Sequence, residues 1–87
     1  MQVEKYLLGK GFKPHIKGFW YIVEAINLVR QDKIYLREVC SKLYPEIAEK
    51  YKDTASKVER AIRHSIFSAG TKMTNAEFIA LAEIETR

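Results

Sequence analysis

Apolar residues recur along most of the chain at spacings of three and four, the repeat of an amphipathic α-helix. The clearest stretch runs from Phe19 to about Gln31. Its broad stripe consists of Phe19, Ile22, Val23, Ile26 and Val29, widened by Trp20 and Leu28. This width predicts the central, most buried helix. Because no run alternates apolar and polar residues and no Asn-Gly or Asp-Gly hairpin signal occurs, the sequence predicts an all-α fold.

Turn and capping residues divide the rest of the chain into further helices. Pro45 suits the first position of a helix and disfavours helical backbone just before it. Asp53 or Thr54 can cap the next helix, and Gly70 can end it. The run from Thr74 to Glu77 has the spacing of a capping box. The expected helices are 3–8, about 36–43, 45–51, about 54–69 and one after 74, which makes one domain of about five to six helices.

The segments 45–51 and about 54–69 flank a short polar break, a spacing typical of a helix-turn-helix at about 45–69. Ala48 is small enough to let the second helix pack closely, and Val58 lies at the expected facing position. The other predicted inner residues are Ile47, Tyr51 and Ile62. Lys52 stands where such turns often have glycine, so we expect a turn built with a negative φ at this residue.

The predicted helix 54–69 has two different sides. One side is small or aliphatic and consists of Ala55, Val58, Ile62, Ser65, Ile66 and Ala69. The other side carries Ser56, Lys57, Glu59, Arg60, Arg63, His64 and Phe67. Arg and Lys can donate to guanine, Glu can accept from cytosine, and a recognition helix reads bases with its N-terminal half. Two interpretations stay open: a DNA-reading helix, or a solvated helix with pairs such as Glu59–Arg63.

The charge distribution and the single cysteine indicate the kind of partner and the cellular compartment to expect. Fifteen basic residues oppose eleven acidic ones, and the excess lies within residues 1–18 and 51–64. This distribution favours a polyanionic partner, with ordinary solvated surface as the alternative. Cys40 cannot form an internal disulfide, so we expect a reducing cytoplasm and a small buried side chain at this position. No apolar run approaches the length of about 20 residues that spans a bilayer, and no secretory signal is visible.

Motifs for catalysis, cofactors and metals are missing from the sequence. It contains no glycine-rich phosphate loop, no HExxH and no CxxC. Metal ligands would have to come from His15, His64, Cys40 and carboxylates scattered over different helices. We therefore expect no enzyme activity, no cofactor, no metal and no small-molecule substrate.

Two runs in the predicted helix-turn-helix carry a resemblance to a known family. Residues 43–51 read LYPEIAEKY, and residues 54–64 read TASKVERAIRH. Together with the runs at 15–18 and 74–80, they closely resemble the DNA-binding effector domain of the master sporulation response regulator of endospore-forming bacteria. The resemblance covers roughly residues 9–82 with one gap.

The resemblance implies a bacterial transcription regulator that binds duplex DNA in the major groove at a box of the form TGNCGAA. Carried over by position, Lys57, Glu59 and Arg60 would contact bases. The residues expected at or near the DNA backbone are Ser56, Arg63, His64, Lys52, His15 and Lys17. The resemblance also implies RNA polymerase or a second copy of the chain as further partners.

Three departures from the family pattern bear on these expectations. Lys57 stands where the family usually has Arg, and Lys cannot form the same planar fork to guanine. The connection 67–73 is short, so a helix of the family that contributes dimer and polymerase contacts is expected to be missing. Eighty-seven residues leave no room for a receiver domain.

Two further hypotheses stay open beside DNA binding. A receiver-less copy could be a protein-interaction module that binds or antagonises a full-length regulator, and the chain could also be a fragment of a longer regulator. Phe67 lies on the polar side of its predicted helix, where it would pack on the final helix or form part of a protein-binding patch.

Overall fold

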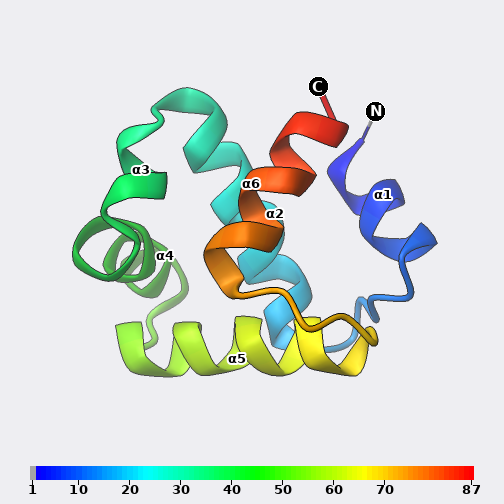
Figure 1. The fold of residues 1–87 in the computed structure, drawn as a ribbon. Helices are drawn as coiled ribbons and strands as arrows, with labels where there is room; N and C mark the ends of the chain where they lie inside the picture. The colour runs from blue at the N-terminus through cyan, green and yellow to red at the C-terminus, as the bar shows by residue number, and fades with distance from the viewer. Residues whose placement is uncertain (1) are drawn as a thin grey trace.

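The computed structural model describes residues 2–87, and this part of the chain contains six α-helices, one π-helical turn and no strand (Figure 1). The elements are α1 (Val3–Gly9), α2 (Lys17–Gln31), α3 (Ile34–Arg37), η1 (Val39–Leu43), α4 (Tyr44–Tyr51), α5 (Ala55–Ser68) and α6 (Asn75–Glu85). The predicted all-α fold class is confirmed.

Helix α2 is the centre of the packing. Nine of its fifteen residues are buried, and it packs against α5 and α6 and also meets α1, α3 and α4. In Figure 1 it runs behind α6 through the middle of the molecule, with α5 lying across one end of the bundle. The broad apolar stripe predicted this position correctly, because a helix with apolar residues over most of its circumference must be covered from several sides.

The first turn of α2 approaches α5 very closely. A β-carbon built on Gly18 would lie 2.2 Å from the carbonyl oxygen of Ala61 and 2.7 Å from Cβ of Ser65. Such distances leave no room for a side chain, so glycine lets the two helix backbones touch. Ser65 is buried at this contact, and its small side chain fits the same narrow gap.

Helix α6 begins with the capping box that the sequence predicts. The Glu77 N–H donates to Thr74 Oγ1 over 3.2 Å, and the Thr74 N–H donates to Glu77 Oε1 over 2.9 Å. The next residue, Asn75, is buried and joins three helices. Its side-chain amide donates to the Tyr44 hydroxyl over 2.9 Å and to the Glu59 carbonyl over 3.2 Å. The start of α6 is therefore tied to both α4 and α5.

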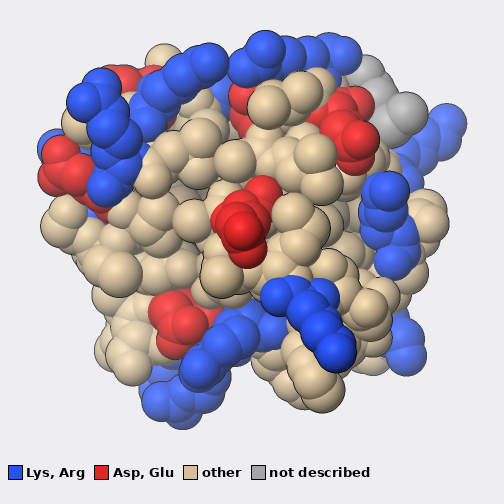
Figure 2. Space-filling view, viewed as in Figure 1, with Lys and Arg blue, Asp and Glu red and all other residues tan. Residues whose placement is uncertain are grey.

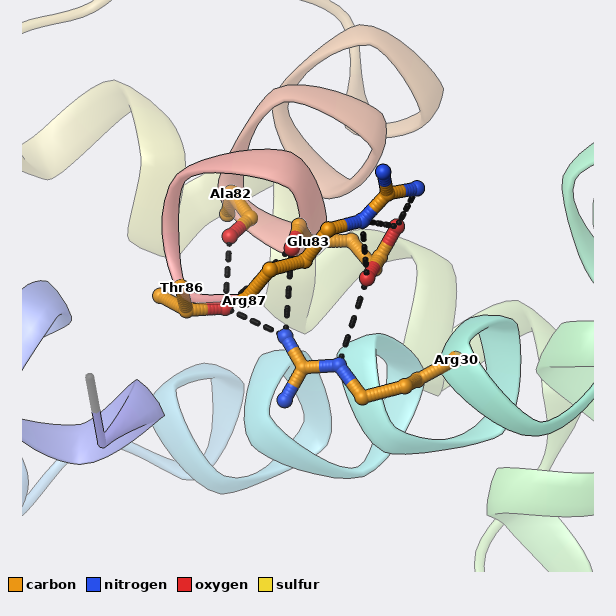
Figure 3. Close-up of polar contacts among 5 residues, drawn as sticks. All are labelled: Arg30, Ala82, Glu83, Thr86 and Arg87. Atoms are coloured by element: carbon orange, nitrogen blue, oxygen red, sulfur yellow. Dashed lines mark hydrogen bonds and ion pairs between the residues drawn. The ribbon is translucent and has the colours of Figure 1, made fainter.

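The end of α6 is held to α2 by a buried carboxylate (Figure 3). Glu83 lies between Arg30 Nε, at 3.2 Å, and Arg87 Nη2, at 2.9 Å. Arg30 also donates to the Glu83 carbonyl over 3.1 Å and to the Thr86 hydroxyl over 2.5 Å. The hydrogen bonds from Arg87, together with those from Arg30, hold the pKa of the Glu83 carboxyl below its usual range. Paired in this way, a buried charge becomes a cross-link between two helices.

The segment predicted as one helix at 36–43 is split, and this prediction was wrong. Backbone angles of φ −123° and ψ 59° at Glu38 end α3, and the wider π-helical turn η1 follows. The break shifts the helical phase, so Leu43 is buried whereas Cys40 is exposed. The expectation of a buried Cys40 therefore fails, because it assumed one uninterrupted stripe.

Trp20 departs from the stripe on which the sequence places it. Its side chain is 43% exposed, and the indole N–H donates to the Pro14 carbonyl over 2.8 Å. The ring packs edge-on against Phe19. Trp20 thus anchors the segment before α2, whereas Leu28, the other widening residue, is buried as predicted.

The contact at Gly18 makes a testable prediction. We expect Gly18→Ala to lower the free energy of unfolding by roughly 3 kcal/mol, because the new methyl group would overlap a backbone carbonyl that cannot move freely. Gly9→Ala is the matched control, since within the described part of the chain nothing lies within 4 Å of a β-carbon built there. Urea denaturation of both variants measures the effect, and equal stability of the two would contradict the close approach.

Candidate nucleic-acid interface

The turn between α4 and α5 sets where the second helix begins. Thr54 has extended backbone angles, and its hydroxyl accepts a hydrogen bond from the Lys57 N–H over 3.2 Å. Thr54 is therefore the N-cap of α5, one of the two residues predicted for this role. The other candidate, Asp53, accepts the Thr54 N–H through its carboxylate over 2.9 Å and lies one residue before the cap.

The inner contact between α4 and α5 is built largely as the sequence predicts. Ala48 and Val58 are buried, and Ile47 and Ile62 are fully covered. Tyr51 was predicted to be an inner residue, but it is 40% exposed. Its ring lies at the surface, edge-on to Tyr21 of α2 at 5.2 Å between ring centres. The buried ring of Tyr21 occupies the space at this junction.

Lys52 adopts a left-handed conformation, with φ 54° and ψ 48°, so the expectation of a negative φ was wrong. The reversal ends α4 and lets the Asp53 N–H reach the Ala48 carbonyl over 2.8 Å. The chain must turn within three residues, and a left-handed residue at the end of a helix achieves this. For a residue with a β-carbon the conformation costs about 1–2 kcal/mol.

The outer side of α5 forms a largely basic surface. Its exposed polar members include Ser56, Lys57, Arg60, Arg63 and His64, whereas Val58, Ile62, Ser65 and Ile66 are buried on the inner side. This agrees with the two sides predicted from the sequence. Figure 2 shows Lys and Arg side chains along the lower part of this face, where Figure 1 places α5, with acidic side chains close by, and further basic side chains along the upper edge and the right side.

Glu59 has a different environment from its neighbours on α5. Its carboxylate lies 3.4 Å from Arg63 Nε, and 37% of its side chain is exposed. The i,i+4 pair considered from the sequence is therefore present in this structure. An exposed pair of this kind contributes less than about 1 kcal/mol, so its rearrangement toward another partner costs little.

Lys17 and His15 lie at and just before the start of α2, the end of that helix that touches α5. Both are surface residues, and Lys17 Nζ is 3.9 Å from Asp53 Oδ2. Lys17 thus lies near the turn that precedes α5. His64, further along α5, has Nε2 at 3.5 Å from the Ser68 hydroxyl.

Sequence reasoning missed a hydrogen bond that joins α2 to the turn. The Tyr21 hydroxyl donates to Asp53 Oδ2 over 2.7 Å. This bond and the one from the Thr54 N–H hold the pKa of the Asp53 carboxyl below its usual range, and the charges of Lys17 and Lys57 act in the same direction. Burial and the same carboxylate raise the pKa of Tyr21 to about 12. The residue types alone gave no signal for this contact, because the partners are 32 residues apart.

Phe67 is 75% exposed, so it does not pack on the final helix. It lies beside a largely apolar groove of about 870 Å³, formed by η1, the first residue of α4, α5, the connection at 71–74 and the first two residues of α6. Arg63 and Glu59 line the same groove. This arrangement favours the other expectation for Phe67, a place in a protein-binding patch.

Within residues 2–87, no three His, Cys, Asp or Glu side chains gather as metal ligands would. Over the same range, no helix is both long and apolar enough to cross a membrane.

The chain matches a known protein family. A family model described as "Sporulation initiation factor Spo0A C terminal" matches residues 3–83 of the 87-residue chain. This family is a DNA-binding effector domain that acts in sporulation and transcription regulation. The match confirms the resemblance inferred from the sequence and extends across the short connection between α5 and α6.

The left-handed conformation of Lys52 predicts that glycine is better suited to this position. Lys52→Gly should raise the free energy of unfolding by about 0.5–1 kcal/mol, because glycine reaches positive φ without strain, although it also adds freedom to the unfolded chain. Glu49→Gly, within α4, is the matched control and should cost about 1 kcal/mol. Thermal unfolding followed by circular dichroism distinguishes the two. A destabilised Lys52→Gly variant would show that the turn is not strained.

Proposed function

Since this chain belongs to the sporulation initiation factor Spo0A C-terminal family, we propose that it regulates transcription by reading a short DNA box through a helix-turn-helix of α4 and α5. The observation that carries this proposal is the two-sided character of α5. Its aliphatic side is buried against α2 and α4, whereas its basic side faces outward, uncovered by any element of residues 2–87. Such a helix is free to enter the major groove.

In the proposed complex, the N-terminal half of α5 lies along the base edges. Lys57, Glu59 and Arg60 read bases, and the residues at or near the backbone are Ser56, Arg63, His64, Lys52, His15 and Lys17. Lys17 supports this division because it projects from α2 beside the start of α5. Phosphate contacts from two elements would fix the register of α5 on the duplex, and the base contacts would supply the sequence preference.

Two residues shape the expected specificity. Lys57 can donate to guanine as a point charge, so its preference should be broader than that of a forked Arg. Glu59 can accept from the amino group of cytosine. To do so, the Glu59 carboxylate must turn away from Arg63, and the Arg63 side chain is then free to contact a phosphate. Because an exposed ion pair of this kind is weak, breaking it costs little free energy.

A protein-interaction module is the second candidate function, and Phe67 is the observation that favours it. A large apolar side chain that is 75% exposed beside a groove of about 870 Å³ is typical of a protein-binding surface. Because Arg63 and Glu59 line this groove, a protein seated there would also approach the proposed DNA-reading side.

The direct test is fluorescence anisotropy with a labelled duplex that contains TGTCGAA and a scrambled duplex of equal composition, at two salt concentrations. We expect the box to be preferred by at least about tenfold, with binding to both duplexes weakening as salt increases. Equal, strongly salt-dependent binding to both would mean phosphate attraction without reading of this box. No binding to either would favour the protein-interaction module.

Glu59 provides a sharper test of the docking. Glu59→Ala should lower discrimination at one base pair of the box by ~1–3 kcal/mol, because the acceptor for that base is lost. Binding to a panel of duplexes with single substitutions measures this change. Glu49→Ala removes the same charge from α4 and should leave the pattern of preferences unaltered. An unchanged pattern for Glu59→Ala would show that α5 does not dock as proposed.

A further inference from the structure

Asp53 places a carboxylate within the surface that the proposed function makes most basic. Its side chain is only 11% exposed, and it lies between Lys17 on α2 and the first turn of α5. A negative charge close to DNA phosphates opposes binding. The Asp53 carboxylate is nevertheless held in this position by hydrogen bonds. Its role there is therefore not to attract DNA through its charge.

Three bonds define the position of Asp53. Its own N–H donates to the Ala48 carbonyl over 2.8 Å, its carboxylate accepts the Thr54 N–H over 2.9 Å, and it accepts the Tyr21 hydroxyl over 2.7 Å. The first two bonds are local to the turn. The third reaches the central helix α2 through a tyrosine that is only 2% exposed.

The Tyr21 bond therefore connects two parts of the proposed interface. One turn before Tyr21, α2 carries Lys17, and Gly18 presses this part of α2 against α5. One residue after Asp53, Thr54 caps α5 and accepts the N–H of Lys57. Asp53 thus lies at the junction that relates the position of Lys17 to that of Lys57.

We propose that Asp53, held by Tyr21, is a positioning residue for DNA recognition. It fixes the start of α5 relative to α2, so that Lys17 on the backbone and the base-reading side chains of α5 meet the duplex in one register. This inference rests on the proposed function, because it assigns a role within the same interface. The preference for the box, and not merely the stability of the fold, then depends on this link.

The experiment compares Tyr21→Phe with Tyr6→Phe. Both changes remove one hydroxyl that donates to a carboxylate, from a buried tyrosine, but Tyr6 bonds to Glu85 of α6 and lies near the other end of α5. Anisotropy with box and scrambled duplexes gives the ratio of affinities, and thermal unfolding gives stability. Tyr21→Phe should reduce the ratio of the two affinities by roughly tenfold, which is about the effect of losing one hydrogen bond to a charged group. The salt dependence of binding should not change, because no charge is removed. Tyr6→Phe should lower stability but keep the ratio.

Two changes at Asp53 separate position from charge. Asp53→Ala removes the acceptor and the charge, so it should bind the scrambled duplex at least as tightly as the wild type while losing preference for the box. Asp53→Asn keeps one oxygen for the Thr54 N–H, and its amide N–H can donate to the Tyr21 oxygen in place of the original bond. It should therefore bind both duplexes more tightly and retain most of the preference. If Asp53→Ala fails to fold, Tyr21→Phe and Asp53→Asn still test whether Asp53 has a positioning role.

The outcomes distinguish this inference from the function on which it rests. A wild-type chain that binds both duplexes equally overturns the proposed function and this role together. A wild type that prefers the box, with Tyr21→Phe showing the same ratio as Tyr6→Phe, overturns the positioning role alone. If Asp53→Ala increased the affinity for both duplexes by the same factor, the ratio of the two affinities would be unchanged. Asp53 would then only repel DNA through its charge, and the positioning role would be overturned.

Discussion

The contact between the first turn of α2 and the middle of α5, at Gly18, is the constraint on which the rest of the structure depends. Without a side chain at this position, the backbone of the central helix lies against the carbonyl of Ala61. This closeness buries one side of α5 and leaves the opposite side uncovered by the described residues. It also brings Lys17 and Tyr21, one residue before and three residues after Gly18, to the end of α5 where the chain turns. Gly18 thus allows the buried side of α5 to lie directly against α2, while the apolar pattern of α5 determines which side is buried.

Hydrogen bonds further fix the position of α5, in addition to its contact with α2 at Gly18. At its start α5 is held by Thr54 and Asp53, and in its middle the Glu59 carbonyl accepts the amide of Asn75. These bonds use backbone groups or the turn before the helix, so they do not occupy the tips of the outward side chains. A rigid helix with free side chains is what recognition of base edges requires, because a poorly held helix would spend binding energy on its own ordering.

Helical periodicity and caps were enough to predict α2, α4, α5, the capping box of α6 and the buried side of α5. They could not predict the split at Glu38, because one non-helical residue shifts the phase of the stripe without changing the residue types. The same limit misplaced Cys40. Trp20 was misplaced for another reason, because its indole N–H bonds to the Pro14 carbonyl at the surface. The positive φ of Lys52 depends on how tightly α4 and α5 must turn, and the Tyr21–Asp53 bond depends on tertiary packing, so neither follows from local pattern. The roles of Lys57, Glu59 and Arg60 at DNA remain predictions.

If α5 reads DNA as proposed, the Glu59–Arg63 pair would let one surface be both solvated and selective. In the free chain the pair satisfies both charges at the surface, so keeping a carboxylate there costs little. In the proposed complex the carboxylate gains an amino group only opposite a base that presents one in the major groove, which is N4 of cytosine or N6 of adenine. Opposite guanine or thymine it would face acceptors and no donor, within a surface surrounded by phosphates. Its contribution is therefore chiefly a penalty against wrong sequences, while affinity comes from the basic side chains around it. Specificity and affinity would then be carried by charges of opposite sign on one helix.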